Sequence, residues 1–113
     1  MNDQITKTMT RIVSMLVTGD FAALERLSGG QRLTADEMRV AITDYPGSLV
    51  MPPHEAFQHL DIVPIQNSKP REWSVIMSLW TDREGRSDLS LETTLTESQH
   101  DLCLVEVDGI HVR

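Results

Sequence analysis

Acidic and aromatic side chains recur at alternate positions in the last third of the chain, where they could form one chemical site. Glu92 and Glu106 are the central pair, and His111 follows a few residues later. Clustered carboxylates can raise one another's pKa, which prepares one of them to act as a general acid. The same groups could instead bind a basic protein around an aromatic anchor, or simply face solvent. We assign the group to partner binding and name no catalytic residue; its members are Ile76, Trp80, Asp88, Glu92, Glu106 and His111.

Residues 54–59 resemble the zinc-binding pattern H-E-x-x-H, in which two histidines share one face of a helix. Here His59 follows His54 by five residues instead of four, so the two side chains would diverge. We therefore predict no metal site in this segment and no bound cofactor. The only cysteine, Cys103, lies in an apolar segment with no histidine placed to activate it, which predicts a core residue.

The candidate site depends on strands that follow one another with short connections. Every second residue is large and apolar over residues 73–79, and the alternation returns over residues 89–95. A third apolar run covers residues 102–107, and alternation resumes at Ile110 and Val112. Period-two alternation is typical of half-buried strands. The last third of the chain is therefore predicted to form an antiparallel meander.

The first connection sets the expected register of the first two strands. A three-residue loop at residues 83–85 would put Gly85 in the left-handed conformation that such loops require. All the apolar residues then share one face, whereas a slip of one residue would scatter them. The predicted pairs are Trp73–Leu95, Val75–Thr93, Ile76–Glu92, Met77–Leu91, Ser78–Ser90, Leu79–Leu89 and Trp80–Asp88.

The second connection is predicted to be a five-residue loop at residues 97–101. It gives the pairs Thr93–Val105, Leu91–Val107 and Glu92–Glu106. Like charges directly opposite each other are unfavourable unless solvent or a partner compensates, so the last pair indicates a binding face. Ile110 and Val112 return to the apolar face only if one residue is looped out at Asp108-Gly109. A bulge is predicted there, with Gly109 in a conformation closed to other residues.

The first half of the chain predicts helices. Residues 3–18 carry apolar side chains at helical spacing, with Asn2 or Asp3 as the cap and Gly19 at the end. Asp20 is predicted to cap a second helix over residues 21–27. The side chains expected to face inward from it are Phe21, Leu24 and Leu27.

A capping box formed by Thr34 and Glu37 predicts the start of a third helix, which extends to about residue 44. Met38, Ala41 and Ile42 are its inward residues. Residues 48–51 predict a short strand that ends at a double proline, and residues 54–60 a helical turn. Residues 60–66 predict another strand, and Pro64 indicates that this strand lies at an edge of the sheet.

The composition favours a small intracellular domain. At 113 residues the chain can build one core, which predicts a single α+β domain over residues 1–113. Its net charge of −7, from 17 acidic and 10 basic residues, disfavours nucleic acid and favours a basic partner. A single cysteine excludes an intrachain disulfide and suits a reducing cytoplasm. Residues 1–4 lack the features of a signal peptide, and no apolar run reaches the roughly 20 residues that span a bilayer, so we expect a cytoplasmic location and no membrane contact.

Residues 19–24 read Gly-Asp-Phe-Ala-Ala-Leu, a "G-D-x-x-x-L" step between the first two predicted helices. With short helices followed by antiparallel strands, the chain resembles the small NTF2-like or cystatin-like bacterial domains. The resemblance implies an α+β fold in which two to three N-terminal helices pack on a curved antiparallel sheet of four to five strands. Members of that superfamily include enzymes, ligand binders and immunity proteins, so the resemblance alone does not select a function.

Two classes of function remain open. The first is a non-catalytic protein-binding module, of the kind formed by bacterial immunity proteins that neutralise a basic toxin. Small size, acidity and the absence of a catalytic motif favour it. The second is a small-molecule binder or enzyme that uses a pocket on the sheet. The sequence leaves the oligomeric state open, including a homodimer.

Overall fold

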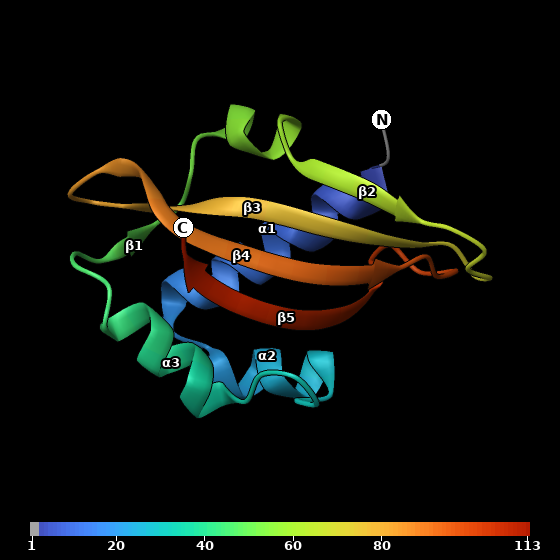
Figure 1. The fold of residues 1–113 in the computed structure, drawn as a ribbon, viewed down its shortest axis with the longest axis horizontal. Helices are drawn as coiled ribbons and strands as arrows, with labels where there is room; N and C mark the ends of the chain where they lie inside the picture. Colours follow the sequence, from blue (N-terminus) through green and yellow to red (C-terminus); the bar gives the residue numbers. More distant parts are fainter. Residues whose placement is uncertain (1–2) are drawn as a thin grey trace.

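The fold is a layer of helices packed on an antiparallel sheet, described for residues 3–113 in a computed structural model (Figure 1). This confirms the predicted α+β class, with three helices and five strands. The elements in chain order are α1 (Asp3–Thr18), α2 (Phe21–Ser28), α3 (Ala35–Thr43), β1 (Leu49–Val50), the 3₁₀ helix η1 (His54–Gln58), β2 (Asp61–Ile65), β3 (Glu72–Thr81), β4 (Gly85–Thr96) and β5 (Leu104–Val112).

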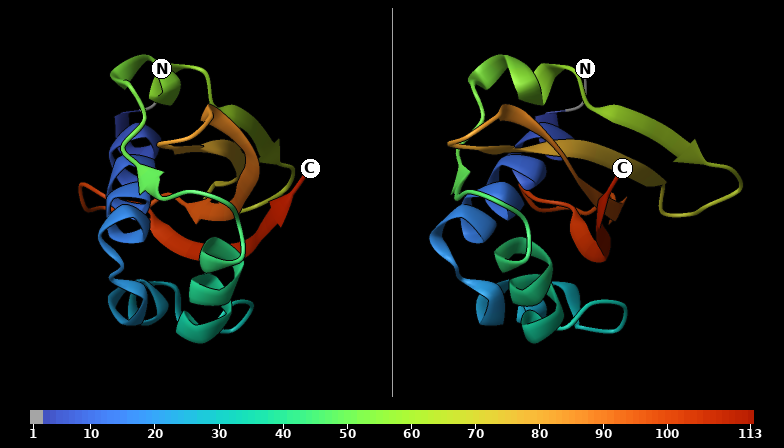
Figure 2. Two further views of the ribbon diagram at one scale, coloured as in Figure 1. Left: turned by 90° about the vertical axis from the view of Figure 1, so that its left-hand side faces the viewer. Right: turned by 60° about the vertical axis from the view of Figure 1, so that its left-hand side comes forward.

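Strand β3 is the centre of the sheet. One of its edges pairs with β4, which in turn pairs with β5, while the other edge is shared by β1 and β2. The sheet curves strongly, with α1 along one face and α2 and α3 close to β5 (Figure 2). As predicted, β2 lies at an edge, because its only partner is β3.

The helix boundaries follow the predicted signals, with two corrections. Thr34 Oγ1 accepts a hydrogen bond from Glu37 N (3.2 Å) and Glu37 Oε1 accepts one from Thr34 N (3.0 Å), which confirms the capping box. Asp20 precedes α2 as predicted, but its side chain makes no capping hydrogen bond. Leu27 is 42% exposed instead of facing inward. At about 100° of rotation per residue, it lies some 120° around the helix from Phe21. The suggested cap Asn2 lies outside the described residues.

The β3–β4 register is confirmed from Glu72 to Ser78 and then shifts. Gly85 has the predicted left-handed conformation (φ 71°), but it pairs with Thr81, so the loop covers residues 82–84. Trp80 therefore lies opposite Arg86 and not Asp88, and no regular Leu79–Leu89 pair forms. The bulge has a local cause. Ser87 Oγ donates to the Leu79 carbonyl (2.6 Å) and accepts from Leu89 N (3.1 Å), which replaces regular ladder bonds.

The β4–β5 register differs from the prediction by two residues. The pairs are Leu95–Val105, Thr93–Val107, Thr94–Glu106, Glu92–Gly109 and Leu91–Ile110. The proposed Glu92–Glu106 pair was therefore wrong. The connection is longer because helix α1 holds it: Thr8 Oγ1 accepts a hydrogen bond from Cys103 N (2.8 Å), and Gln4 Nε2 donates to the Ser98 carbonyl (2.9 Å). The predicted bulge is present, with Asp108 looped out.

The core lies between α1 and the covered face of the sheet. Its fully buried residues include Ile5, Met9, Ile12, Leu16, Leu24, Met38, Val75, Leu79, Leu89, Leu91 and Leu95. Cys103 is 4% exposed within this core, and burial raises the pKa of its thiol, so the prediction of a core residue is confirmed. Val112 was expected on the apolar face, but it is 65% exposed because it ends the edge strand β5. Over residues 3–113, none of the helices has the length and apolar character that a membrane crossing needs.

Candidate functional site

The structure brings some of the six predicted site residues together and separates others. Ile76 and Trp80 line a pocket, whereas Asp88 lies in the β4 bulge. The main chain of Asp88 is bound on both sides, since its N–H donates to the Tyr45 hydroxyl (3.2 Å) and its carbonyl accepts from Arg113 N (2.9 Å). Glu92 is the cross-strand partner of Ile76, and His111 is the partner of Ser90, so both lie next to residues that line the pocket. Glu106 instead lies opposite Thr94, further along the open face.

The region around Glu106 contains carboxylates in ion pairs, although the buried Asp108 Oδ1 accepts no hydrogen bond from residues 3–113. Arg32, from the loop between α2 and α3, places its Nε 3.0 Å from Glu106 Oε1 and 3.6 Å from Asp108 Oδ1. Thr94 Oγ1 donates to the other Asp108 oxygen (2.7 Å). We call these four residues, Arg32, Thr94, Glu106 and Asp108, the Arg32 patch. Sequence reasoning missed it because Arg32 lies 74 residues from Glu106 along the chain.

His111 and Glu92 lie beside this patch. His111 Nε2 is 3.9 Å from Glu92 Oε2, and its ring lies directly over Gly109. A Cβ added at Gly109 would clash with that nitrogen, although Gly109 does not have a positive φ. The prediction that Gly109 adopts a conformation closed to other residues was therefore wrong. The glycine instead leaves room for the imidazole.

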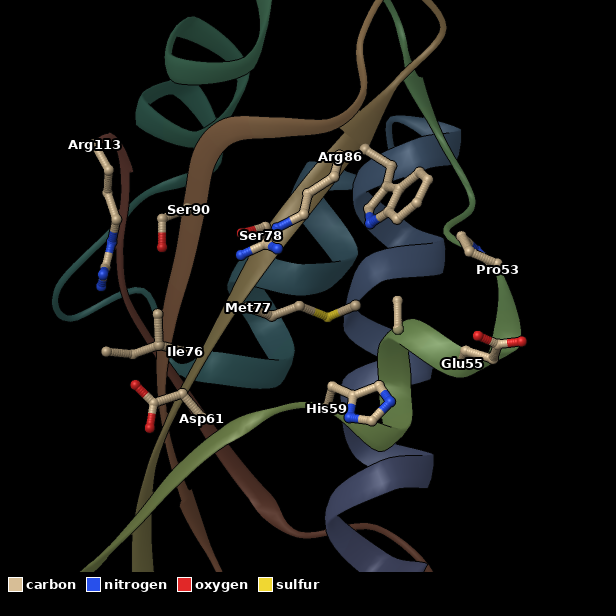
Figure 3. A pocket seen from close by; sticks show the side chains of 12 residues that line it. Pro53, Glu55, His59, Asp61, Ile76, Met77, Ser78, Arg86, Ser90 and Arg113 are labelled. Carbon is tan, nitrogen blue, oxygen red and sulfur yellow. The ribbon is translucent and has the colours of Figure 1, made fainter.

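A pocket of about 510 Å³ opens on the same face, at the β1 and β2 side of β3. This volume is within the range of small-molecule sites. Its wall combines sheet residues with residues from the segment that precedes β2 (Figure 3). The lining residues are Pro53, Glu55, Ala56, His59, Asp61, Ile76, Met77, Ser78, Trp80, Arg86, Ser90 and Arg113. We call it the sheet pocket.

The sheet pocket lies at a gap in the sheet. Strand β1 pairs with β3 as far as Trp80, and β2 pairs with it only up to Ile76. Between the two strands, Pro52 and Pro53 end β1, and η1 carries the chain away from the edge. Residues 77–79 of β3 consequently have no strand partner on this side.

The gap leaves main-chain groups of Ser78 facing the pocket. The carbonyls of Val75 and Leu79 point towards β4, where they accept hydrogen bonds from the hydroxyls of Thr93 (3.0 Å) and Ser87 (2.6 Å). Successive strand residues direct their N–H and C=O groups to opposite edges. Those of Ser78 therefore point to the unpaired edge, where a ligand can bind them.

Two serine hydroxyls form the polar floor of the sheet pocket. Ser78 and Ser90 are cross-strand partners on β3 and β4, so their side chains share a face. Ser90 is 2% exposed, yet its hydroxyl makes no hydrogen bond to any residue within 3–113. Ser90 is buried as a residue, but its hydroxyl is not sealed from solvent, because Asp108 Oδ1 is the one buried side-chain atom without a hydrogen bond in residues 3–113. The hydroxyl therefore opens into the pocket and is free to donate to or accept from a ligand. Such a group at the floor of a pocket indicates a position where a ligand binds.

Charged side chains surround this floor. Arg86 and Arg113 lie on the same side of the pocket as Ser78 and Ser90 (Figure 3). Within the described part of the chain, neither arginine forms an ion pair. Two guanidinium groups beside free hydroxyls can bind a carboxylate or phosphate through charge-assisted hydrogen bonds.

Part of this site could have been found from the sequence. The alternation that predicted β3 and β4 already put Ser78 and Ser90 opposite each other on the open face. Arg86 was not recognised because it reaches that face through the β4 bulge. The positions of Asp61 and Glu55 in the pocket depend on how the segment before β2 folds over the gap. The sequence of that segment has no periodic pattern that would predict this path.

The chain belongs to a family described as a domain of unknown function (DUF7668), which it matches over residues 13–113. No curated protein and no solved structure matches it. The NTF2-like resemblance and the immunity role therefore remain predictions. The structure itself shows the α+β fold described above.

Proposed function

We propose that this protein is a non-catalytic binding module that holds a small anionic ligand in the sheet pocket. The observation that carries the proposal is the Ser90 hydroxyl at the pocket floor, which has no hydrogen bond within residues 3–113 and shares the pocket with two arginines that form no ion pair there. A carboxylate bound there would accept hydrogen bonds from the guanidinium groups and from the serine hydroxyls.

The contacts favour binding over catalysis. A serine nucleophile needs an adjacent base within hydrogen-bond reach. Neither Ser78 nor Ser90 has such a hydrogen bond among residues 3–113. Cys103 is buried in the core with a raised thiol pKa, which disfavours the reactive thiolate.

The proposal can be tested by titrating the protein with N-acetylleucine, a monocarboxylate, and measuring the NMR chemical shifts of the backbone amides. We expect shifts concentrated at Ser78 and Ser90, and an affinity at least tenfold weaker after Arg86→Ala combined with Arg113→Ala. Arg83→Ala is the matched control, because Arg83 is an exposed arginine of the same hairpin outside the pocket lining. Equal affinities of the double variant and the control would contradict the proposal.

Docking of a basic protein on the open face stays a prediction. Its basis was repulsion between Glu92 and Glu106, but these residues are not paired, and Glu106 is bound by Arg32. Replacing Glu92 and Glu106 by Gln still tests it, since a docking face should lose association rate with little change in stability.

A further inference from the structure

The sheet pocket has opposite charges at its two sides. Arg86 and Arg113 lie beside the serine floor, whereas Asp61 lies beside Ile76 at the start of β2 and Glu55 projects from η1 (Figure 3). The lining thus has two arginines and two carboxylates, although the whole chain has a net charge of −7. This balance distinguishes the pocket from the rest of the surface.

The four charged groups do not neutralise one another. No ion pair joins Asp61 or Glu55 to either arginine in the described residues, in contrast to Arg32 and Glu106 at 3.0 Å. Opposite charges held apart across a small pocket match a ligand that carries both signs. A simple anion would use only the arginine side.

The wall between the charged sides is apolar. Ile76 lies on β3 between the serine floor and Asp61, and Met77 and Ala56 line the side that faces η1. Ile76 and Ala56 are both partly exposed, so an apolar group bound against them would be removed from water together with their own apolar surface.

We infer that the ligand is a small zwitterion with an apolar group, the chemistry shared by apolar α-amino acids and short apolar peptides. This inference rests on the proposed anion-binding function. The carboxylate binds at Arg86 and Arg113 over the serine floor, and the ammonium group binds at Asp61. The main-chain N–H and C=O of Ser78 at the gap complete the recognition, because they can pair with a ligand amide as a strand would.

Isothermal titration with four matched compounds tests the inference: leucine, leucyl-leucine, N-acetylleucine without the ammonium group, and leucinamide without the carboxylate. We expect at least one zwitterion to bind tenfold or more tightly than both blocked compounds. Tighter binding of leucyl-leucine would identify peptides as the source, and tighter binding of leucine would identify free amino acids. If N-acetylleucine equals the zwitterions, the inference is wrong while the proposed function stands. If no carboxylate binds, both are wrong.

An Asp61→Asn variant gives an independent check. Asp61 is exposed, so the change should leave the melting temperature unaltered. It should weaken zwitterion binding about tenfold or more without weakening N-acetylleucine. The control is Asp101→Asn, an exposed acid in the β4–β5 connection, which should change neither. Unchanged preference for the zwitterion in the Asp61 variant would overturn the placement of the ammonium group.

Discussion

The Arg32 patch and the sheet pocket lie on the same open face and have similar residue types, but they differ in how their polar groups are satisfied. In the patch, Arg32 contacts Glu106 and Asp108, and Thr94 binds the remaining oxygen of Asp108. In the pocket, Ser90 and the two arginines have no such partners in the described chain. Charge and aromatic content alone selected residues from both regions, namely Ile76 and Trp80 in the pocket and Glu106 in the patch. The pocket differs from the patch in that its charged side chains form no ion pairs with one another in the described residues, whereas the patch keeps one buried oxygen, Asp108 Oδ1, without a hydrogen bond.

The largest expected effect on stability comes from Ser87→Ala. Ser87 is 5% exposed and its hydroxyl binds both Leu79 O and Leu89 N, so its loss leaves buried main-chain groups unpaired. We expect a decrease of about 1–3 kcal/mol in the free energy of unfolding, measured by urea denaturation. A change below 0.5 kcal/mol, on the order of a surface substitution, would contradict the structural role of the bulge.

Arg32→Ala should have a moderate effect. It leaves Glu106 and Asp108 adjacent without their cation, at a site where the arginine is still 61% exposed. A loss of about 0.5–1 kcal/mol is expected at low salt and less at 1 M salt, because exposed ion pairs are screened. N-acetylleucine affinity should stay constant. A tenfold change would show that patch and pocket are not independent.

Gly109→Ala should change the free energy of unfolding by less than about 0.5 kcal/mol. The new methyl group displaces the His111 ring, which is a flexible end of a side chain, and the backbone there does not need a positive φ. NMR signals of the His111 ring should shift while the melting temperature stays level. A loss above about 1 kcal/mol would mean that the ring cannot move.

Ser90→Ala should have the smallest effect on stability. It also gives the clearest test of whether the pocket binds a ligand while the Arg32 patch is structural. Its hydroxyl has no partner to lose in the free protein, so the free energy of unfolding should stay level or rise by a few tenths of a kcal/mol. Binding of N-acetylleucine should weaken about threefold to tenfold, the loss of one hydrogen bond. Destabilisation comparable to that of Ser87→Ala would show that Ser90 is structural and not a ligand contact.

Local patterns in the sequence predicted those features that depend on neighbouring residues. Period-two alternation located β3 and β4, and the pairs from Trp73–Leu95 to Ser78–Ser90 follow from keeping one face apolar. The Thr34 capping box and the bulge at Asp108 were also predicted correctly. In each case the physical cause, such as a side chain that caps a helix, acts within a few residues.

The predicted pairs Glu92–Glu106 and Trp80–Asp88 are wrong where side-chain hydrogen bonds outside the regular ladder set the register. Thr8, on α1, binds Cys103 N and lengthens the β4–β5 connection, which moves Glu106 away from Glu92. The Ser87 hydroxyl similarly replaces ladder bonds and puts Arg86 opposite Trp80. Each of these changes in register is small. A register change of two residues is nevertheless enough to give a strand residue a different cross-strand neighbour.

The sequence by itself determined the α+β class, the helix starts and which face of each strand is apolar, because these follow from propensity, capping and alternation along the chain. Only the tertiary structure decided where the pocket lies. The pocket exists because β1 and β2 leave residues 77–79 of β3 uncovered, and because η1 and the start of β2 place Glu55 and Asp61 in the same lining as Arg86. That arrangement depends on contacts between segments that are distant in sequence, for which no local pattern is a guide.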